Sequence, residues 1–552
     1  MTETNVLYYG DNLDILRRYI PDAAVDLIYL DPPFNSNRAY SVIFKDESGR
    51  GSDAQIEAFD DTWHWGPRVE STYQYLTNFS RHQGAVSTEV SALVGALRKA
   101  IGTNQMMAYL VEMTVRLAEL HRVLKPTGSL WLHCDPTASH YLKIVLDSIF
   151  GPDNFLNEVI WKRWSAHGNA GRIGNIHDVL LLYGRTTGAK FNKVYTPHDD
   201  TYVEARFRFA DPGGRRWMEQ NLANPAVRPN LMYDYQASNG IIYKSPPNGW
   251  KYTLDRMQRL DREGRLYFPS KVGGRLRLKV YLDELSGALL QDVWTDIYGV
   301  GGSGAERLGY PTQKPLPLLE RIISISSNPG DIVLDPFCGC GTALIAAQKL
   351  GRRWLGIDIT YLSIAVMESR LVRSFPELGH TKVIGQPTEV EGARMLAEQS
   401  LHDRYEFQYW ALTQIGAQPV GDKKKGADAG IDGRIAFTEA GNDVKFVLVS
   451  VKSGGVNVAM VRDLVGTMKR EDAPLGLFVT LDEPSGPMKV EAAGAGTYWS
   501  ELANRDYPRV QIVTVKDLLE GRRPTLPLLV LPTFQQAERV HVAPGQEEMF
   551  GS

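Results

Sequence analysis

The chain has 552 residues, of which 43% are hydrophobic and 23% are charged, and its formal net charge is −3. This is the composition of a globular protein of about two to four domains, and it excludes a disordered chain. Three cysteines are too few for a disulfide framework, no signal peptide is visible and no apolar run could span a bilayer, so we expect a cytoplasmic protein without a membrane partner.

The first 150 residues alternate short apolar strands with amphipathic helices, a pattern typical of a parallel sheet with helical crossovers. Residues 36–66 are polar and rich in Gly, Asp and Ser, so we expect a long loop without a packed element there. Strands are predicted at 6–9, 25–30, 129–133, 158–163 and 177–183, and helices at 13–19, 103–123 and 137–150.

The second predicted strand ends at Asp31-Pro32-Pro33-Phe34. Two consecutive prolines lack the N–H groups that a strand ladder needs, so the chain passes into a stiff turn. A carboxylate and a proline carbonyl can accept hydrogen bonds from an exocyclic amine, while a phenyl ring can stack on the planar base that carries it. The alternative is an ordinary strand-end turn with a packed phenylalanine, and the tetrapeptide alone does not decide between them.

Between residues 186 and 290 the alternation stops, and residues 201–280 contain 15 Lys and Arg against 7 Asp and Glu. Basic residues interleaved with aromatic ones suit contacts to phosphates and bases, although a solvated basic face would have the same composition. The basic residues are Arg206, Arg208, Arg215, Arg216, Lys271, Arg275, Arg277 and Lys279, and the aromatic ones are Trp250, Tyr252, Tyr267 and Phe268.

A second strand–helix unit follows, with a helix at 316–326, strands at 331–335 and 353–358, and a glycine turn and a helix (343–350) between the strands. A glycine turn lets a ligand approach the N–H groups at the start of a helix, and the acid that ends the next strand, Asp358, is well placed to hold ribose hydroxyls. Together these features are a specific signal for a nucleotide-like cofactor. Cys338 and Cys340 could instead bind a metal, but no second pair accompanies them.

From about residue 400 a separate α/β unit begins, with helices at 404–415 and 461–469 and strands at 444–451 and 476–480. The chain after residue 525 is rich in proline and then polar, which indicates a terminal tail.

The tetrapeptide Asp31-Pro32-Pro33-Phe34 resembles the catalytic motif of amino-group DNA methyltransferases that use S-adenosylmethionine. The run Asp335-Pro336-Phe337-Cys338-Gly339-Cys340-Gly341-Thr342 resembles their cofactor motif, and Pro311-Thr312-Gln313-Lys314-Pro315 is a further family hallmark. The catalytic motif comes first, and this permuted order resembles the β class, which includes the modification subunits of type III restriction systems. The resemblance covers about residues 5–370.

The resemblance implies a flipped-out target base, with Asp31 and the Pro32 carbonyl on its amine and Phe34 stacked on its ring. In the family, the acid matching Asp335 and the glycine turn hold the methionine part of the cofactor, and the acid matching Asp358 holds the ribose. The implied catalytic residues are Asp31, Pro32, Pro33 and Phe34, and the implied cofactor-binding residues are Asp11, Lys314, Asp335, Pro336, Phe337, Gly339, Gly341, Thr342 and Asp358.

An Asp at the head of the catalytic motif is commoner among adenine N6 enzymes than among cytosine N4 enzymes, so we expect adenine. The alternative is a cytosine N4 enzyme. RNA or a protein glutamine is a further alternative substrate, but the basic insert favours double-stranded DNA, as does the C-terminal unit, which resembles a nuclease through residues that include Asp432 and Lys452. Many β-class members are dimers, so the resemblance also implies a homodimer.

The C-terminal unit resembles the Mrr-like branch of the PD-(D/E)XK nuclease fold through Gly430-Ile431-Asp432-Gly433 and Val449-Ser450-Val451-Lys452. In that fold two acidic or amide side chains hold Mg²⁺, and the lysine assists the attacking water. Asp432 and Lys452 match, but Ser450 stands where the second ligand belongs, and a hydroxyl is a poor Mg²⁺ ligand. A helix carboxylate such as Glu406 could substitute. Two readings therefore stay open: a Mg²⁺-dependent endonuclease, or a domain that only binds DNA or partners.

The tail contains Gln546-Glu547-Glu548-Met549-Phe550, which resembles the short peptide that docks on bacterial sliding clamps. The expected architecture is a permuted Rossmann-like α/β methyltransferase with an inserted target-recognition region and a C-terminal restriction-endonuclease-like α/β domain, part of a restriction–modification or phage-defence system. The expected domains are a catalytic half (1–185), the insert (186–300), a cofactor half (301–390), the nuclease-fold domain (400–520) and the tail (521–552).

Overall fold

The structure is a computed structural model. It describes residues 3–33, 39–45, 51–60, 64–82, 86–165, 173–270, 273–300, 313–379, 381–398, 401–420, 431–440 and 443–527. The chain divides into two compact units, one made of Lys193–Gln291 and the other of Met1–Asn192 with Asp292–Ser552. Among the described residues, no helix has the length and apolar character needed to cross a membrane.

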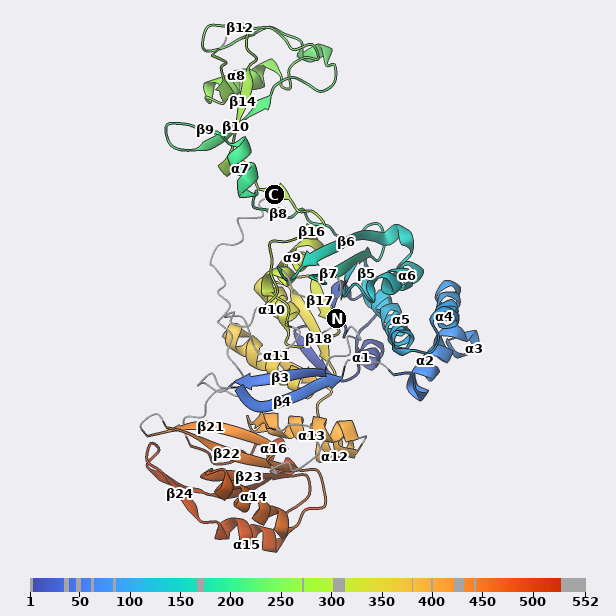
Figure 1. The fold of residues 1–552 in the computed structure, drawn as a ribbon, viewed down its shortest axis with the longest axis vertical. Coiled ribbons are helices and arrows are strands. Elements are labelled where there is room, and N and C mark those ends of the chain that lie inside the picture. The colour runs from blue at the N-terminus through green and yellow to red at the C-terminus, as the bar shows by residue number, and fades with distance from the viewer. Residues whose placement is uncertain are drawn as a thin grey trace. The chain divides into compact units, whose positions relative to one another are not determined.

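The larger unit is built on a nine-stranded sheet with the order β16-β6-β7-β5-β2-β17-β18-β1-β19. Among these strands, Figure 1 labels β5, β6, β7, β16, β17 and β18. All neighbouring strands are parallel except at β7, which runs antiparallel to both β5 and β6. The strands are β1 Val6–Tyr9, β2 Val25–Leu30, β5 Leu124–Cys134, β6 Phe155–Lys162, β7 His177–Gly184, β16 Val293–Trp294, β17 Ile332–Asp335, β18 Arg353–Asp358 and β19 Lys382–Ile384. The mostly parallel sheet confirms the predicted α/β fold.

Helices cover the sheet, and apolar side chains of α1, α5 and α6 form one core with the strands. The long helix α5 begins where the Asn104 side chain accepts a hydrogen bond from the Met107 N–H, an N-cap that polar residues often provide. The helices of this part are α1 Asn12–Tyr19, α2 Pro67–Thr77, α3 Phe79–His82, α4 Thr88–Ile101, α5 Gln105–Val123, α6 Ser139–Phe150, α9 Leu316–Ser326, α10 Thr342–Lys349 and α11 Tyr361–Ser374.

The strands β2 and β17 are neighbours, although about 300 residues separate them in the chain; Leu27 pairs with Val333 and Ile28 with Leu334. Every residue of β2 is buried, as expected for a central parallel strand covered on both faces. The buried Asp26 carboxylate accepts hydrogen bonds from Lys125, from Lys190 and from the N–H of Ile332 at the start of β17. This polar contact favours the pairing of the two strands.

The prediction of a loop at 36–66 is wrong. Ala39–Lys45 (β3) and Gly51–Asp60 (β4) form an antiparallel pair. Both segments contain β-branched and aromatic residues that favour strands, but the polar composition of the whole stretch concealed this local preference.

The smaller unit contains a four-stranded antiparallel sheet in the order β13-β14-β10-β9 and the helix α8, Leu254–Arg262. Its core includes Trp250, whose indole N–H donates to the carbonyl of Tyr233 at 2.7 Å. This indole, expected to contact bases, is therefore a core residue that is only 3% exposed. The strands are β9 Phe209–Ala210, β10 Arg216–Asn221, β13 Leu266–Tyr267 and β14 Arg277–Tyr281.

The C-terminal domain has its own five-stranded sheet in the order β20-β21-β22-β23-β26, which confirms a separate α/β domain. Its strands β21, β22 and β23 are labelled in Figure 1. Side chains of β22 alternate, so that Val447 and Val449 pack in the core that includes α13, while Leu448 packs in the core that includes α14. The elements are β20 Gln418–Pro419, β21 Gly433–Glu439, β22 Asp443–Lys452, β23 Leu475–Thr480, β26 Val510–Thr514, α12 Val390–Glu398, α13 Leu401–Gln414, α14 Val458–Arg470, α15 Gly486–Gly494 and α16 Val515–Leu519.

Candidate functional site

Four adjacent parallel strands end at one edge of the large sheet, and most of the predicted site residues follow those ends. Asp31 follows β2, Asp335 ends β17, Asp358 ends β18 and Asp11 lies just beyond β1. Ligands of open α/β sheets bind at the carboxyl ends of the strands. Strand pairing therefore brings the tetrapeptide and the glycine turn to the same edge.

The Asp31 carboxylate forms an ion pair with Lys314, whose ammonium group donates to Oδ2. Both side chains are mostly buried, with 15% of Asp31 and 13% of Lys314 exposed. Pro32 is buried and Pro33 is half-buried. Phe34 and the clamp-like peptide at 546–550 lie outside the described residues.

Asp335 is 3% exposed, and its Oδ1 accepts a hydrogen bond from the N–H of Phe337 at 3.0 Å. Burial raises the pKa of Asp335 to about 8; Asp31 and Asp358 reinforce this shift, whereas the Phe337 N–H and Lys314 oppose it. The strand ends therefore contain a carboxyl group that holds its proton near neutral pH, and a cation bound beside it would release that proton.

Asp358 links the glycine turn to the start of α11. Its Oδ2 accepts from the N–H of Gly339 at 2.9 Å, and its Oδ1 accepts from both the N–H and the hydroxyl of Thr360, each at 2.9 Å. Burial raises the pKa of Asp358, and these three donors oppose the shift. The loop after β17 and the helix after β18 thus share one carboxylate.

The glycine turn depends on a left-handed backbone at Gly341, where φ is +76°. A Cβ atom there would lie 2.7 Å from Cγ of Met367. Cys338 and Cys340 are buried, and burial raises the pKa of the Cys338 thiol well above its usual value. Within the described ranges, no three His, Cys, Asp or Glu side chains are grouped so that they could hold a metal ion.

Replacing Gly341 by alanine should lower the free energy of unfolding by about 1–3 kcal/mol, because a side chain strains the left-handed backbone and meets Met367. The matched control is Gly95→Ala in α4, where a Cβ atom meets nothing within 4 Å. That change should raise stability by about 0.5–1 kcal/mol. Urea denaturation of both variants measures the difference, and a Gly341→Ala protein as stable as the Gly95→Ala protein would contradict the expectation.

Three residues that contact the site or its neighbours were not identified from the sequence, because they belong to no recognisable motif. Asn12 donates to the carbonyl of Pro336 at 2.9 Å, and Arg116 of α5 donates to the Asn12 side chain at 2.7 Å. Arg370 of α11 donates to the carbonyl of Cys340 and to the hydroxyl of Thr342, each at 3.1 Å. All three support the glycine turn from elements distant in sequence, which single-sequence patterns cannot detect.

Asp11 is the N-cap of α1, where its carboxylate accepts from the N–H of Leu13 at 2.8 Å. It also pairs with Arg116 at 3.0 Å and with Arg68 at 2.5 Å. Burial would raise the pKa of Asp11, but these two guanidinium groups hold it below its usual value. Asp11 therefore lies near the predicted cofactor residues as part of an ion-pair network.

In the C-terminal domain, the structure brings Asp432 and Lys452 together, with 3.5 Å between the ammonium and the carboxylate. The Asp432 oxygens also accept from Gln408 at 2.9 Å, from the Ser450 hydroxyl at 3.3 Å and from the N–H of Val451 at 2.6 Å. Protein donors thus already surround this carboxylate. Glu406, the predicted substitute ligand, instead accepts from the N–H of Tyr361 at 2.8 Å. Of the two readings left open by the sequence, the Mg²⁺ site is not supported. A cation would find one carboxylate that already accepts several hydrogen bonds, and one hydroxyl, which is a poor Mg²⁺ ligand.

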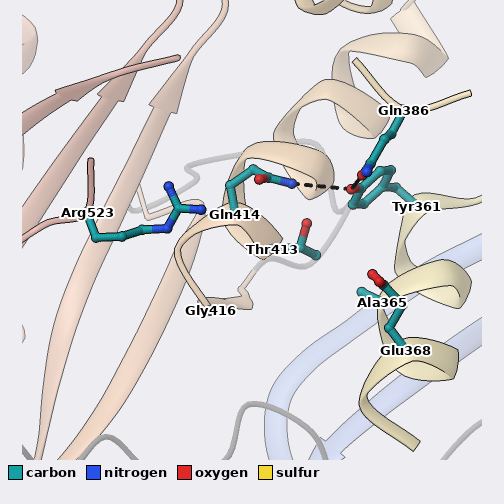
Figure 2. Close-up of a pocket in the computed structure, with 8 residues that line it drawn as sticks. All are labelled: Tyr361, Ala365, Glu368, Gln386, Thr413, Gln414, Gly416 and Arg523. Atoms are coloured by element: carbon teal, nitrogen blue, oxygen red, sulfur yellow. Dashed lines mark hydrogen bonds between the residues drawn. The ribbon is translucent and has the colours of Figure 1, made fainter. Parts of the chain in front are cut away.

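A cavity of about 340 Å³ lies between α11 and the C-terminal end of α13 (Figure 2). The Tyr361 hydroxyl donates to Gln386 at 2.6 Å and accepts from Gln414 at 3.3 Å. Burial raises the pKa of Glu368 in this cavity to about 7. The lining residues are Tyr361, Ala365, Glu368, Gln386, Thr413, Gln414, Gly416 and Arg523.

A family model of N6 and N4 methylases, described as DNA methylase, matches residues 25–366. A second model, described as NACHT-associated inactive restriction endonuclease 1, matches residues 405–520, in agreement with the altered motif at Ser450. The first match includes the smaller unit, Lys193–Gln291, and the second lies within the C-terminal domain.

Among curated proteins, the chain is 31% identical to the type II methyltransferase M.EcaI of Enterobacter cloacae, over 46% of this chain and 54% of that protein. It is 26% identical to the Mod subunit of the type III restriction-modification enzyme StyLTI of Salmonella typhimurium, over 63% of this chain and 50% of that protein. It is 25% identical to the DNA adenine methyltransferase YhdJ of Escherichia coli, over 65% of this chain and 79% of that protein. The chain spans about half the length of the first two relatives.

Proposed function

The chain belongs to the N6/N4 DNA methylase family, and on this premise we propose that it transfers a methyl group from S-adenosylmethionine to N6 of adenine in double-stranded DNA. The observation that carries the proposal is the pairing of β2 with β17, because it sets the Asp31 turn beside the Asp335 turn. We further propose that it acts in restriction–modification or phage defence, as the names of its relatives suggest.

The residues at the strand ends fit this cofactor. Asp335 is a buried carboxyl group suited to a cationic ligand, and the start of α10 after Gly341, which has no side-chain cap, offers N–H groups to a carboxylate. We assign the ribose hydroxyls to Asp358, whose oxygens also accept from Gly339 and Thr360. Bound there, S-adenosylmethionine would supply a methyl group activated by its sulfonium. The chain's own task is then to bind and align the two reactants.

The target amine would bind at the Asp31 turn. Lys314 holds Oδ2 of Asp31, so we assign the amine to Oδ1 and to the carbonyl of Pro32. The base has to leave the duplex stack, because its amino group is unreachable inside it. Hydrogen bonds from both amine hydrogens would orient the nitrogen lone pair toward the methyl group, with Phe34 assigned to stack on the ring.

We assign target recognition to Lys193–Gln291 and, within it, to one face of α8. Met257 and Leu260 are buried in the core, while arginines at every third position are exposed, namely Arg256, Arg259 and Arg262. Guanidinium groups suit both phosphates and guanine edges. Some arginines expected to contact DNA are engaged within the unit: Arg215 pairs with Asp283 at 2.8 Å and Arg277 with Glu219 at 4.0 Å.

The test is methyl transfer from labelled S-adenosylmethionine to duplex DNA, followed by digestion to nucleosides and mass spectrometry. We expect N6-methyladenine. N4-methylcytosine alone would overturn the assignment of the base, and incorporation into RNA or protein instead of DNA would overturn the assignment of the substrate. Sequencing of the methylated DNA then defines the recognition site.

A further inference from the structure

The start of α11 lies against the cofactor residues of the large sheet. Its N-cap, Thr360, binds the Asp358 carboxylate through both its N–H and its hydroxyl, and the same carboxylate holds the N–H of Gly339 in the glycine turn. A shift of the first turn of α11 would therefore move both Asp358 and the glycine turn.

The C-terminal domain supplies the group that holds this first turn. The N–H of Tyr361, which an α-helix cannot satisfy by itself, donates to Oε2 of Glu406 at 2.8 Å. The Tyr9 hydroxyl at the end of β1 donates to the same oxygen at 3.4 Å. Glu406 is 5% exposed, and an acceptor oxygen at a helix N-terminus satisfies N–H groups that have no partner within the helix.

A second polar contact and an apolar core reinforce the contact between α11 and α13. Gln414 of α13 donates to the Tyr361 hydroxyl at 3.3 Å, as Figure 2 shows, so that α13 holds Tyr361 at both its N–H and its hydroxyl. Phe407 and Trp410 of α13 pack in one buried cluster with Leu362 of α11. The two helices thus form a single packed element.

The same helix also contacts the altered nuclease centre, because Gln408 donates to Asp432 at 2.9 Å. Two residues that are two positions apart on α13 therefore contact different sites. Glu406 accepts from the N–H of Tyr361 beside the strand ends of the large sheet, and Gln408 donates to Asp432 in the C-terminal domain. The C-terminal domain, which lacks a complete metal site, thus has a structural role: it holds the start of α11 in the methyltransferase part of the chain.

We infer that Glu406 is a positioning residue for the cofactor site, so that the C-terminal domain completes the S-adenosylmethionine-binding end of the methyltransferase sheet. The inference rests on the proposed function. Without Glu406, the first turn of α11 loses the acceptor of the Tyr361 N–H. The contacts of Thr360 then remain to hold the turn against Asp358 and, through Asp358, against Gly339. Cofactor affinity should fall, while the alignment of the amine at Asp31 remains.

The test compares Glu406→Ala, Glu406→Gln and the control Gln408→Ala in the full chain. Glu406→Ala should raise the dissociation constant and the KM for S-adenosylmethionine about tenfold with little change in kcat or in KM for DNA. Glutamine keeps an oxygen that can accept from Tyr361, so Glu406→Gln should restore most of the affinity. Gln408→Ala should leave cofactor affinity unchanged.

A second readout uses the ligand-free protein. Hydrogen exchange of the amides at 359–364 should be about tenfold faster in Glu406→Ala than in the wild type, while β5 keeps its protection. Unchanged exchange in Glu406→Ala, or faster exchange with unchanged cofactor affinity, would overturn the inference. A wild type that binds no S-adenosylmethionine would overturn the proposed function, and the exchange result would still decide whether Glu406 orders α11.

Discussion

Replacing Asp31 by alanine is expected to lower the rate of DNA methylation by about a hundred- to a thousandfold, the usual loss for one hydrogen-bonding group at a reacting atom. The expected loss follows from position: Asp31 comes directly after β2, the strand that pairs with β17, and we assign the target amine to its carboxylate. Binding of S-adenosylmethionine should be largely retained. Single-turnover methylation under saturating cofactor and DNA measures the loss directly.

Two further variants test whether the loss of rate comes from the Asp31 carboxylate itself. Asp31→Asn keeps the shape and one acceptor oxygen but presents an NH₂ group to the amine, so its rate should fall between the wild type and Asp31→Ala. Asp153, an exposed acid after α6, provides the control Asp153→Ala, which should methylate at the wild-type rate. An Asp31→Ala protein within tenfold of that control would refute the assignment of Asp31.

The affinity for S-adenosylmethionine should depend on pH through Asp335, whose pKa burial raises to about 8. Below this pH the carboxyl group holds a proton, and a cationic ligand has to displace that proton to gain the charge. Affinity should therefore fall as the pH drops below 8, by at most about tenfold per pH unit. Calorimetric titrations in buffers of different ionisation enthalpy would also detect the released proton.

The variant Asp335→Asn separates the part of the pH dependence of cofactor affinity that comes from the Asp335 carboxyl group. The ammonium group of the cofactor titrates equally with both proteins, so the ratio of mutant to wild-type dissociation constants should rise between pH 6 and 8 and then level off. A ratio that is constant across this range would show that Asp335 is already ionised in the free protein.

Asp335 also affects folding stability, with a definite sign. The folded carboxyl group keeps its proton up to about pH 8, whereas the unfolded one loses it near its ordinary value of about 4, so the unfolded chain binds fewer protons between these values. The contribution of Asp335 to stability therefore falls as the pH rises through this window. Asp335→Asn should remove that part of the pH dependence.

Much of the fold was predictable from local pattern. The strands at Val25–Leu30 and Ile332–Asp335 are short apolar runs that end at proline or glycine turns, and both occur as predicted. The hairpin within 39–60 was missed, because composition averaged over 36–66 outweighed two short strand-forming segments. The direction of β7, antiparallel within a parallel sheet, depends on pairing and leaves no clear signal in the strand itself.

The two motifs of the site, the Asp31 tetrapeptide and the glycine turn after Asp335, were also predictable from local sequence, because proline restricts the backbone and glycine permits turns that other residues disfavour. The residues that support them were not. Arg116 acts through Asn12 from a helix about 100 residues away, and Glu406 lies in another domain. In the sequence, Glu406 was only one helix carboxylate that could substitute for the missing ligand of the nuclease centre.

The sequence by itself therefore determined which chemical groups are present and which turns carry them: the Asp31 tetrapeptide, the glycine turn after Asp335 and the altered motif at Ser450. The tertiary structure decided which of these groups meet. It placed β2 beside β17, surrounded Asp432 with protein donors and turned Glu406 toward Tyr361. The physical reason is that local sequence restricts backbone torsions, whereas the partner of a buried carboxylate depends on strand pairing and helix packing between distant segments.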